Sequence, residues 1–85
     1  MKVYIPPPLR SYTGSKEVDV EGNTLRDVLS GLDRRYPGIR FRVVNEQDGI
    51  REHIRFFVNQ ELAKDLNTQL RPGDEIHIIC AISGG

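Results

Sequence analysis

The sequence has few of the features that mark secreted, metal-binding or membrane proteins. It contains one cysteine, Cys80, and no tryptophan. A single cysteine cannot form an intramolecular disulfide, and four cysteine or histidine ligands for a structural zinc are absent, so we expect a cytoplasmic protein without a metal site. The longest apolar run, residues 78–82, is far shorter than the roughly 20 residues that span a bilayer. The N-terminus has no signal-peptide core, so we expect neither export nor a membrane partner.

Neither sign of charge is in excess, and the chain is short. Twelve Lys and Arg balance twelve Asp and Glu, so the net positive field that non-specific nucleic-acid binding needs is absent. We therefore expect no nucleic-acid partner. Its 85 residues suffice for one domain, in which about 60–65% of the unfolded chain's surface can be buried. This small core disfavours an enclosed active site.

Hydrophobic patterning predicts one helix among short strands. Apolar and polar residues alternate over residues 2–5, 17–20, 54–58 and 75–80. Thr24 followed by Asp27 resembles a capping box and predicts a helix start, and Pro37-Gly38 predicts its end. The apolar stripe of this helix consists of Leu25, Val28, Leu29, Leu32 and Tyr36.

The remaining segments have no periodic pattern. Residues 6–16 hold three prolines and predict a long loop, and residues 39–53 are expected to be irregular. Turns are predicted at Asn59-Gln60 and, as type II, at residues 71–74. The order β, β, α, β, β predicts an α+β fold, with one main helix packed on one face of the sheet, because a single apolar stripe covers a single face.

The last two residues are glycines, which random composition produces about once in two hundred chains. A glycine pair has no side chain to obstruct a narrow channel, so a partner enzyme could thread it into an active site. The five residues after Cys80 reach at most about 17 Å when extended. We expect residues 81–85 to form a flexible tail; a frayed terminus without a role is the alternative.

Several short motifs add to this terminal pair. They are Tyr36-Pro37-Gly38, Phe57-Val58-Asn59, Pro72-Gly73-Asp74-Glu75 and Ser83-Gly84-Gly85. With these motifs and its element order, essentially the whole chain resembles the ubiquitin-like sulfur carriers of the MoaD/ThiS family. The resemblance implies a β-grasp fold: a mixed sheet in which the first and last strands pair in parallel at the centre.

The resemblance also implies a function. An E1-like enzyme would adenylate the carboxylate of Gly85 with ATP and magnesium, and a sulfur donor would displace AMP to leave a thiocarboxylate. The carrier itself would bind no cofactor and have no catalytic site. The residues implied to thread into the partner are Ala81, Ile82, Ser83 and Gly84.

Two departures from the family pattern stand out. Many members have Pro-Pro where this chain has Cys80-Ala81, and Asn-Gly where it has Asn59-Gln60. Glutamine is less favourable than glycine at a left-handed backbone angle.

The length of residues 37–53, together with Ala81, resembles members that serve cysteine biosynthesis. The sulfur acceptor would then be an aminoacrylate on a pyridoxal-phosphate cysteine synthase, and a zinc isopeptidase would release the product. Three alternatives stay open. The chain could be the small subunit of molybdopterin synthase, which inserts its tail into the large subunit, a ubiquitin-like protein modifier, or an interaction module with an unused tail.

A docking surface is predicted on the sheet face opposite the helix. Alternation places Phe57, His77 and Ile79 there. The alternative is that residues 39–53 fold over that face and cover it.

Three other features have two interpretations each. Six arginines between Arg34 and Arg55, against three acidic residues, could meet an acidic partner or a nucleotide, or could form a solvated face. Cys80 lies on the inward side of its strand and is interpreted as a core residue rather than a reactive thiol. His53 and His77 have no partners at metal or triad spacing and are interpreted as surface residues.

Overall fold

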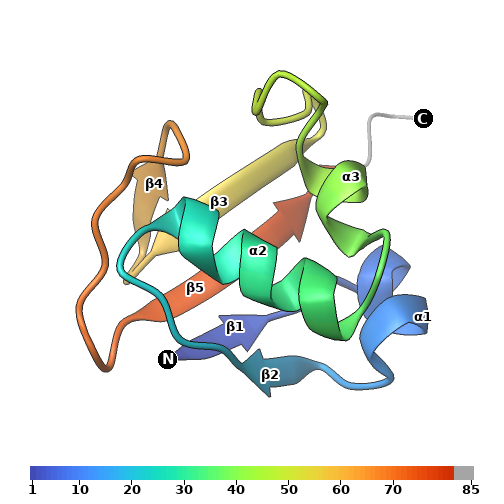
Figure 1. Ribbon diagram of the computed structural model, residues 1–85, viewed down its shortest axis with the longest axis horizontal. Helices are drawn as coiled ribbons and strands as arrows, with labels where there is room; N and C mark the ends of the chain where they lie inside the picture. Colours follow the sequence, from blue (N-terminus) through green and yellow to red (C-terminus); the bar gives the residue numbers. More distant parts are fainter. Residues whose placement is uncertain (82–85) are drawn as a thin grey trace.

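The computed structural model describes residues 1–81 and shows a mixed five-stranded sheet with a helix packed across one face. The elements are β1 (Lys2–Tyr4), the 3-10 turn η1 (Pro7–Leu9), α1 (Arg10–Thr13), β2 (Glu17–Asp19), α2 (Leu25–Arg35), α3 (Ile39–Val43), β3 (Ile54–Val58), β4 (Glu61–Ala63) and β5 (Glu75–Cys80). In Figure 1, α2 lies across the strands, and α1 and α3 lie at the end of the molecule where β5 finishes. The predicted α+β class is confirmed.

The first and last strands lie side by side at the centre of the sheet. The strand order is β2-β1-β5-β3-β4. The β1–β5 pair is parallel, with Val3 opposite Ile76, and the other three pairs are antiparallel. This is the β-grasp arrangement that the family resemblance implied, and it makes β5, which leads into the C-terminal tail, an interior strand.

The main helix forms for the reasons visible in its sequence. The Asp27 amide donates to Thr24 Oγ1 over 3.3 Å, and the Thr24 amide donates to Asp27 Oδ2 over 3.2 Å, which completes a capping box. Four stripe residues are buried against the sheet: Leu25, Val28, Leu29 and Leu32. The predicted helix start is confirmed, and so is the buried face except for Tyr36, which lies at the C-cap and is only partly buried.

The prediction of an irregular segment over residues 39–53 is wrong for its first part. The chain forms α3 immediately after Gly38, which adopts a left-handed φ of 97°. Asp33 Oδ1 on the preceding helix accepts hydrogen bonds from the amides of Gly38 and Arg40, both over 3.1 Å. A carboxylate from α2 thus satisfies amides at the start of α3. This cap has no signal in the local sequence of α3.

The prediction of a long loop over residues 6–16 is also wrong. Proline fits the first turn of a helix, since it lacks only an amide that would have no partner there. The chain accordingly forms η1 and α1, and α1 ends at Gly14, which has a φ of 71°. Leu9 is buried within this segment and ties it to the core.

A fifth strand, β4, follows the predicted turn at Asn59-Gln60. Val58 pairs with Glu61 across the two turn residues, both of which have positive φ. The strand was missed because only Ala63 of its three residues is buried, so it lacks an alternating apolar pattern. The second predicted turn is confirmed, since Gly73 has a φ of 92° and the Asp74 amide donates to the Arg71 carbonyl.

The core lies between the sheet and the helices. Its strand residues alternate as predicted, with Val3, Ile54, Phe56, Ile76 and Ile78 almost fully buried. Within residues 1–81, no polar or charged residue is buried. None of the helices in this part of the chain has the length and apolarity to cross a membrane. Because the core lies on the helix side of the sheet, the strand residues that point away from the core lie on the opposite face.

Candidate functional site

The C-terminal tail leaves the sheet from its central strand. Cys80 pairs with Ile54 at the beginning of β3, and the amide of Ala81 donates to the carbonyl oxygen of His53 over 2.7 Å. These contacts fix the point from which the tail departs. The predicted threading residues Ile82, Ser83 and Gly84, and the predicted modification site Gly85, lie outside the described residues, whereas Ala81 is described and exposed.

The sheet face opposite α2 carries a row of mostly apolar side chains. The strand register places Tyr4 opposite His77, His77 opposite Phe57, and Phe57 opposite Leu62. The row therefore crosses β1, β5, β3 and β4 in succession. Ile79 stands next to it on β5, two residues beyond His77. Leu62 and Ile79 are 48% and 43% exposed, so the row and Ile79 form an open, mostly apolar surface, which we call the docking surface after the role predicted for it.

At the β1 end of this row, two rings are stacked. The Tyr4 and His77 ring centroids are 4.3 Å apart and their planes differ by 11°. The Tyr4 hydroxyl donates to Glu75 Oε2 over 3.4 Å. Desolvation, followed by the charge of Glu75, raises the pKa of Tyr4 above its usual value. The tyrosine is neutral at pH 7 and presents its ring as part of the row.

The structure places the three predicted docking residues on the predicted face. The alternative, in which residues 39–53 cover that face, is wrong, because Ile39, Val43 and Val44 are buried in the core on the helix side. Sequence reasoning missed Tyr4 and Leu62. Alternation in residues 2–5 gave the signal for Tyr4, whereas Leu62 belongs to the strand that was not predicted.

Two open grooves meet at the end of β5. The first, which we call the tail-exit groove, has a volume of about 570 Å³ and is lined by Pro8, Leu9, Phe41, Arg42, Arg51, His53, Cys80 and Ala81. The second, the proline groove, has a volume of about 380 Å³ and is lined by Tyr4, residues 5–8, Arg10 and residues 77–80. Pro8 and Cys80 line both grooves. The end of β5 is thus flanked by two hollows on the surface.

Cys80 is partly buried at the rim of the core and lines both grooves. Desolvation raises the pKa of its thiol, so the thiol form dominates at pH 7. Among the described residues, no group of three His, Cys, Asp or Glu side chains could hold a metal ion. The inward position predicted for Cys80 is confirmed, although its burial is incomplete.

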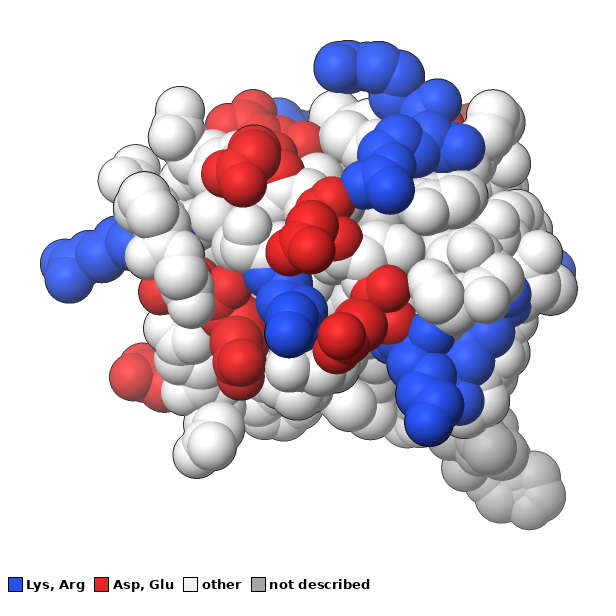
Figure 2. Space-filling view, turned by 90° about the horizontal axis from the view of Figure 1, so that it is seen from below, with Lys and Arg blue, Asp and Glu red and all other residues white. Residues whose placement is uncertain are grey.

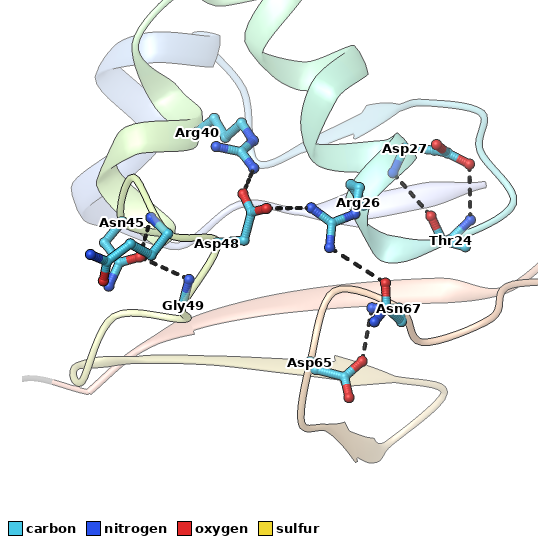
Figure 3. Close-up of polar contacts among 10 residues, drawn as sticks. Thr24, Arg26, Asp27, Arg40, Asn45, Asp48, Gly49, Asp65 and Asn67 are labelled. Atoms are coloured by element: carbon cyan, nitrogen blue, oxygen red, sulfur yellow. Dashed lines mark hydrogen bonds and ion pairs between the residues drawn. The ribbon is translucent and has the colours of Figure 1, made fainter.

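The loop between α3 and β3 is fixed by Asp48 (Figure 3). Its carboxylate accepts hydrogen bonds from Arg26 Nη1 of α2, over 2.6 Å, and from Arg40 Nη2 of α3, over 2.5 Å. These two arginines lower the pKa of Asp48, Arg40 having the larger effect. Inside the loop, Asn45 Oδ1 accepts from the Gly49 amide over 2.8 Å. We call this arrangement of Asp48 with its two arginines the Asp48 clamp. It holds the loop between α3 and β3, whose later residues Arg51 and His53 line the tail-exit groove.

The arginine-rich segment divides into paired and unpaired side chains. Arg40 is neutralised by Asp48. Arg42 and Arg51, by contrast, line the tail-exit groove and form no ion pair within residues 1–81. In Figure 2, basic side chains dominate the right-hand part of the view, the end that holds α1 and α3, while acidic ones gather at the centre and left. In this view, most of the charged side chains at the right-hand end are therefore basic.

Comparison with known proteins accounts for nearly the whole chain. The family described as "ThiS family" matches residues 3–85. The sulfur carrier protein CysO of Mycobacterium tuberculosis is 35% identical over 89 aligned residues, which cover 98% of this chain and 96% of that protein.

Two solved structures are similar throughout. A chain of the Amycolatopsis orientalis BexX/CysO complex superposes with a TM-score of 0.91 at 32% identity, covering 99% of this chain and 98% of that chain. The small archaeal modifier protein 1 of Methanosarcina acetivorans superposes with a TM-score of 0.83 at 28% identity, covering 99% and 94%.

Proposed function

The chain belongs to the ThiS family, and from that premise we propose that it is a sulfur carrier that acts through the carboxylate of Gly85. The observation that carries this conclusion is the length of the family match, which runs from Val3 to Gly85 and so includes the terminal glycine pair. The sulfur carrier from Mycobacterium tuberculosis is similar over nearly its full length.

The proposed reaction takes place on the tail. An E1-like adenylating enzyme binds ATP and magnesium, the Gly85 carboxylate attacks the α-phosphate, and pyrophosphate leaves. A sulfide equivalent from a donor then attacks the acyl carbon, and AMP leaves with the bonding electrons, which yields the thiocarboxylate. Adenylation is required because a free carboxylate is a poor electrophile.

The carrier's own part is to present the tail. Residues 81–85 can reach at most about 17 Å from the end of β5, far enough to enter a partner's channel. Glycine at positions 84 and 85 leaves such a channel unobstructed. The catalytic groups and the cofactors belong to the partner in this proposal, and the Cys80 thiol, with its raised pKa, takes no part.

The docking surface is proposed to bind the activating enzyme. Tyr4, His77 and Phe57 present an aromatic row, and Leu62 and Ile79 are the exposed aliphatic side chains beside them. Aromatic residues in a contiguous apolar patch are typical of interface centres. The tail begins on the same strand, β5, so one partner can bind the surface and receive the tail together.

For the sulfur acceptor we propose a pyridoxal-phosphate cysteine synthase. The thiocarboxylate sulfur would add to the β-carbon of a bound aminoacrylate, an S-to-N acyl shift would leave cysteine amide-linked to Gly85, and a zinc isopeptidase would hydrolyse that amide. The identity to the CysO sulfur carrier favours this acceptor over the large subunit of molybdopterin synthase. The likeness to a small archaeal modifier protein makes protein modification the second candidate.

Mass spectrometry of the intact carrier tests the proposal. The carrier is incubated with the recombinant adenylating enzyme of its host, ATP, magnesium and sulfide, and we expect replacement of one oxygen by sulfur. A chain lacking Gly85 should show no conversion and the same thermal unfolding midpoint, whereas a matched Ser83→Ala variant should still be converted. Conversion of the chain without Gly85 would contradict the proposed site.

A second reaction distinguishes the acceptors. The thiocarboxylate form is incubated with the host's cysteine synthase and O-phosphoserine or O-acetylserine. An adduct of the mass of cysteine supports cysteine biosynthesis. A carrier joined to a lysine of another protein would instead support the modifier function.

A further inference from the structure

Three arginines surround the point at which the tail leaves the sheet. Arg42 and Arg51 line the tail-exit groove together with His53. Arg10 lines the proline groove on the other side of the β5 end. The three come from separate segments of the chain, namely α1, α3 and the segment before β3. We call them the arginine collar.

Carbonyl oxygens and aromatic rings hold the collar in place. Arg10 Nε donates to the Ile5 carbonyl over 3.0 Å, and Arg51 Nε donates to the Phe41 carbonyl over 2.7 Å. The Arg51 guanidinium carbon also lies 4.5 Å from the centroid of the Phe41 ring. The Arg42 guanidinium carbon lies 6.0 Å from the centroid of the Tyr12 ring.

These contacts position the guanidinium groups without neutralising them. Arg10 and Arg51 use Nε for their carbonyl bonds, so both Nη atoms remain available for a planar, bidentate ligand. Within residues 1–81 no collar arginine forms an ion pair, and neither groove has an Asp or Glu in its lining. Arg26 and Arg40, which share Asp48, are the contrasting case.

We propose that the arginine collar binds carboxylate side chains at the mouth of the channel in the activating enzyme that receives the tail. This inference rests on the proposed function, because only a tail that enters a partner brings the collar to a channel mouth. Ordered, unpaired guanidinium groups fit carboxylates through two parallel hydrogen bonds. A protein partner is favoured over a nucleic acid, because the whole chain has a formal charge of zero.

The collar affects the rate at which the carrier and the activating enzyme associate, rather than the rate of the chemical step. Charges at the rim of an interface mainly raise the association rate and make it dependent on salt. At physiological ionic strength the screening length is about 8 Å, and at 1 M it is about 3 Å. The collar's contribution should therefore be large in dilute salt and small in concentrated salt.

Steady-state kinetics of thiocarboxylate formation by the host's adenylating enzyme test the collar. For Arg42→Gln/Arg51→Gln we expect KM for the carrier to rise roughly tenfold at low salt, with kcat unchanged and a weaker salt dependence. The matched control is Arg34→Gln/Arg71→Gln, which removes the same charge at exposed positions outside both grooves. Its KM should stay within about twofold of the unmodified carrier.

A lysine pair separates charge from structure. Arg42→Lys/Arg51→Lys keeps both charges but loses the Nε bond to the Phe41 carbonyl, as the glutamine pair does. It should keep the salt dependence of KM, which comes from charge, and recover only part of the low KM, because lysine cannot form the two parallel hydrogen bonds; all variants should unfold at similar urea concentrations. A lysine pair with the same KM and the same weakened salt dependence as the glutamine pair would show that the residues act through structure rather than charge, and would overturn the inference.

The remaining outcomes are also decisive. If the unmodified carrier is converted and the glutamine pair has the same KM and salt dependence, the inference is wrong and the proposed function stands. If the unmodified carrier is not converted by an active enzyme, both fail. An unchanged KM with loss of binding to a 20-nucleotide RNA would assign the arginines to nucleic acid instead.

Discussion

Replacing Gln60 with glycine should stabilise the domain. Gln60 and Asn59 form the two-residue turn between β3 and β4, with φ angles of 75° and 50°. This geometry is the tight hairpin turn that favours Asn-Gly. Asn59 compensates for its left-handed angle, because its side-chain amide donates to Asp74 Oδ1 over 2.8 Å and its Oδ1 accepts from the Glu75 amide over 2.9 Å. Gln60 makes no such side-chain bond within the described residues.

The size of the effect follows from two opposing contributions. A left-handed angle costs about 1–2 kcal/mol for a residue with a β-carbon. Glycine relieves this strain but loses about 0.5–1 kcal/mol more conformational free energy on folding. The midpoints of these ranges give a net gain of about 0.75 kcal/mol for Gln60→Gly, which corresponds to a rise in Tm of roughly 3–6 °C for a domain of this size.

Urea unfolding of three variants tests this reasoning. Gln60→Gly should raise the midpoint. Gln60→Ala keeps the β-carbon and should leave the midpoint close to its original value. Asn59→Gly relieves the same strain but removes both hydrogen bonds of Asn59, so it should not stabilise. A midpoint lowered by Gln60→Gly, or raised as much by Gln60→Ala, would refute the argument from backbone strain.

Two further predictions concern the Asp48 clamp and the docking surface. Because Arg40 and Arg26 lower the pKa of Asp48 in the folded state, its stabilising effect is present above the unfolded pKa of about 3.9 and is lost as the pH falls through the lower folded value. Urea unfolding should therefore show Asp48→Asn less stable than the parent at pH 7 and equally stable at the acidic limit; a gap that does not change with pH would contradict this. Phe57→Asp should leave the domain folded by circular dichroism and raise KM for the adenylating enzyme even in concentrated salt, unlike the collar variants. An unchanged KM would exclude the docking surface.

Local signals explain which elements the sequence predicted. The cap at Thr24 and the stripe from Leu25 to Leu32 lie within one continuous segment, so α2 could be predicted from it. The cap of α3 comes instead from Asp33 on another helix. In β4, Glu61 and Leu62 are both exposed, so the strand depends on its pairing with β3 rather than on burial. Elements stabilised by residues outside themselves were the ones missed.

The candidate site divides in the same way. Alternation along single strands was enough to place Phe57, His77 and Ile79 on one face. The row from Tyr4 to Leu62 depends on how neighbouring strands are paired, and this register cannot be predicted from the sequence of one strand alone. The arginines were noticed as a cluster in sequence, but only the fold separates Arg40, which is paired, from Arg42 and Arg51.

The parallel pairing of β1 with β5 has a consequence for how the domain forms. Tyr4 and Glu75, which lie on these neighbouring strands and share a hydrogen bond, are separated by 71 residues in the sequence. Contacts between such distant segments form slowly, because a long loop must close before they contribute. During synthesis the first strand must wait until β5 has emerged. A chain interrupted before β5 therefore lacks both the central pairing and the tail, so an incomplete product offers its partners neither a folded surface nor a terminus to activate.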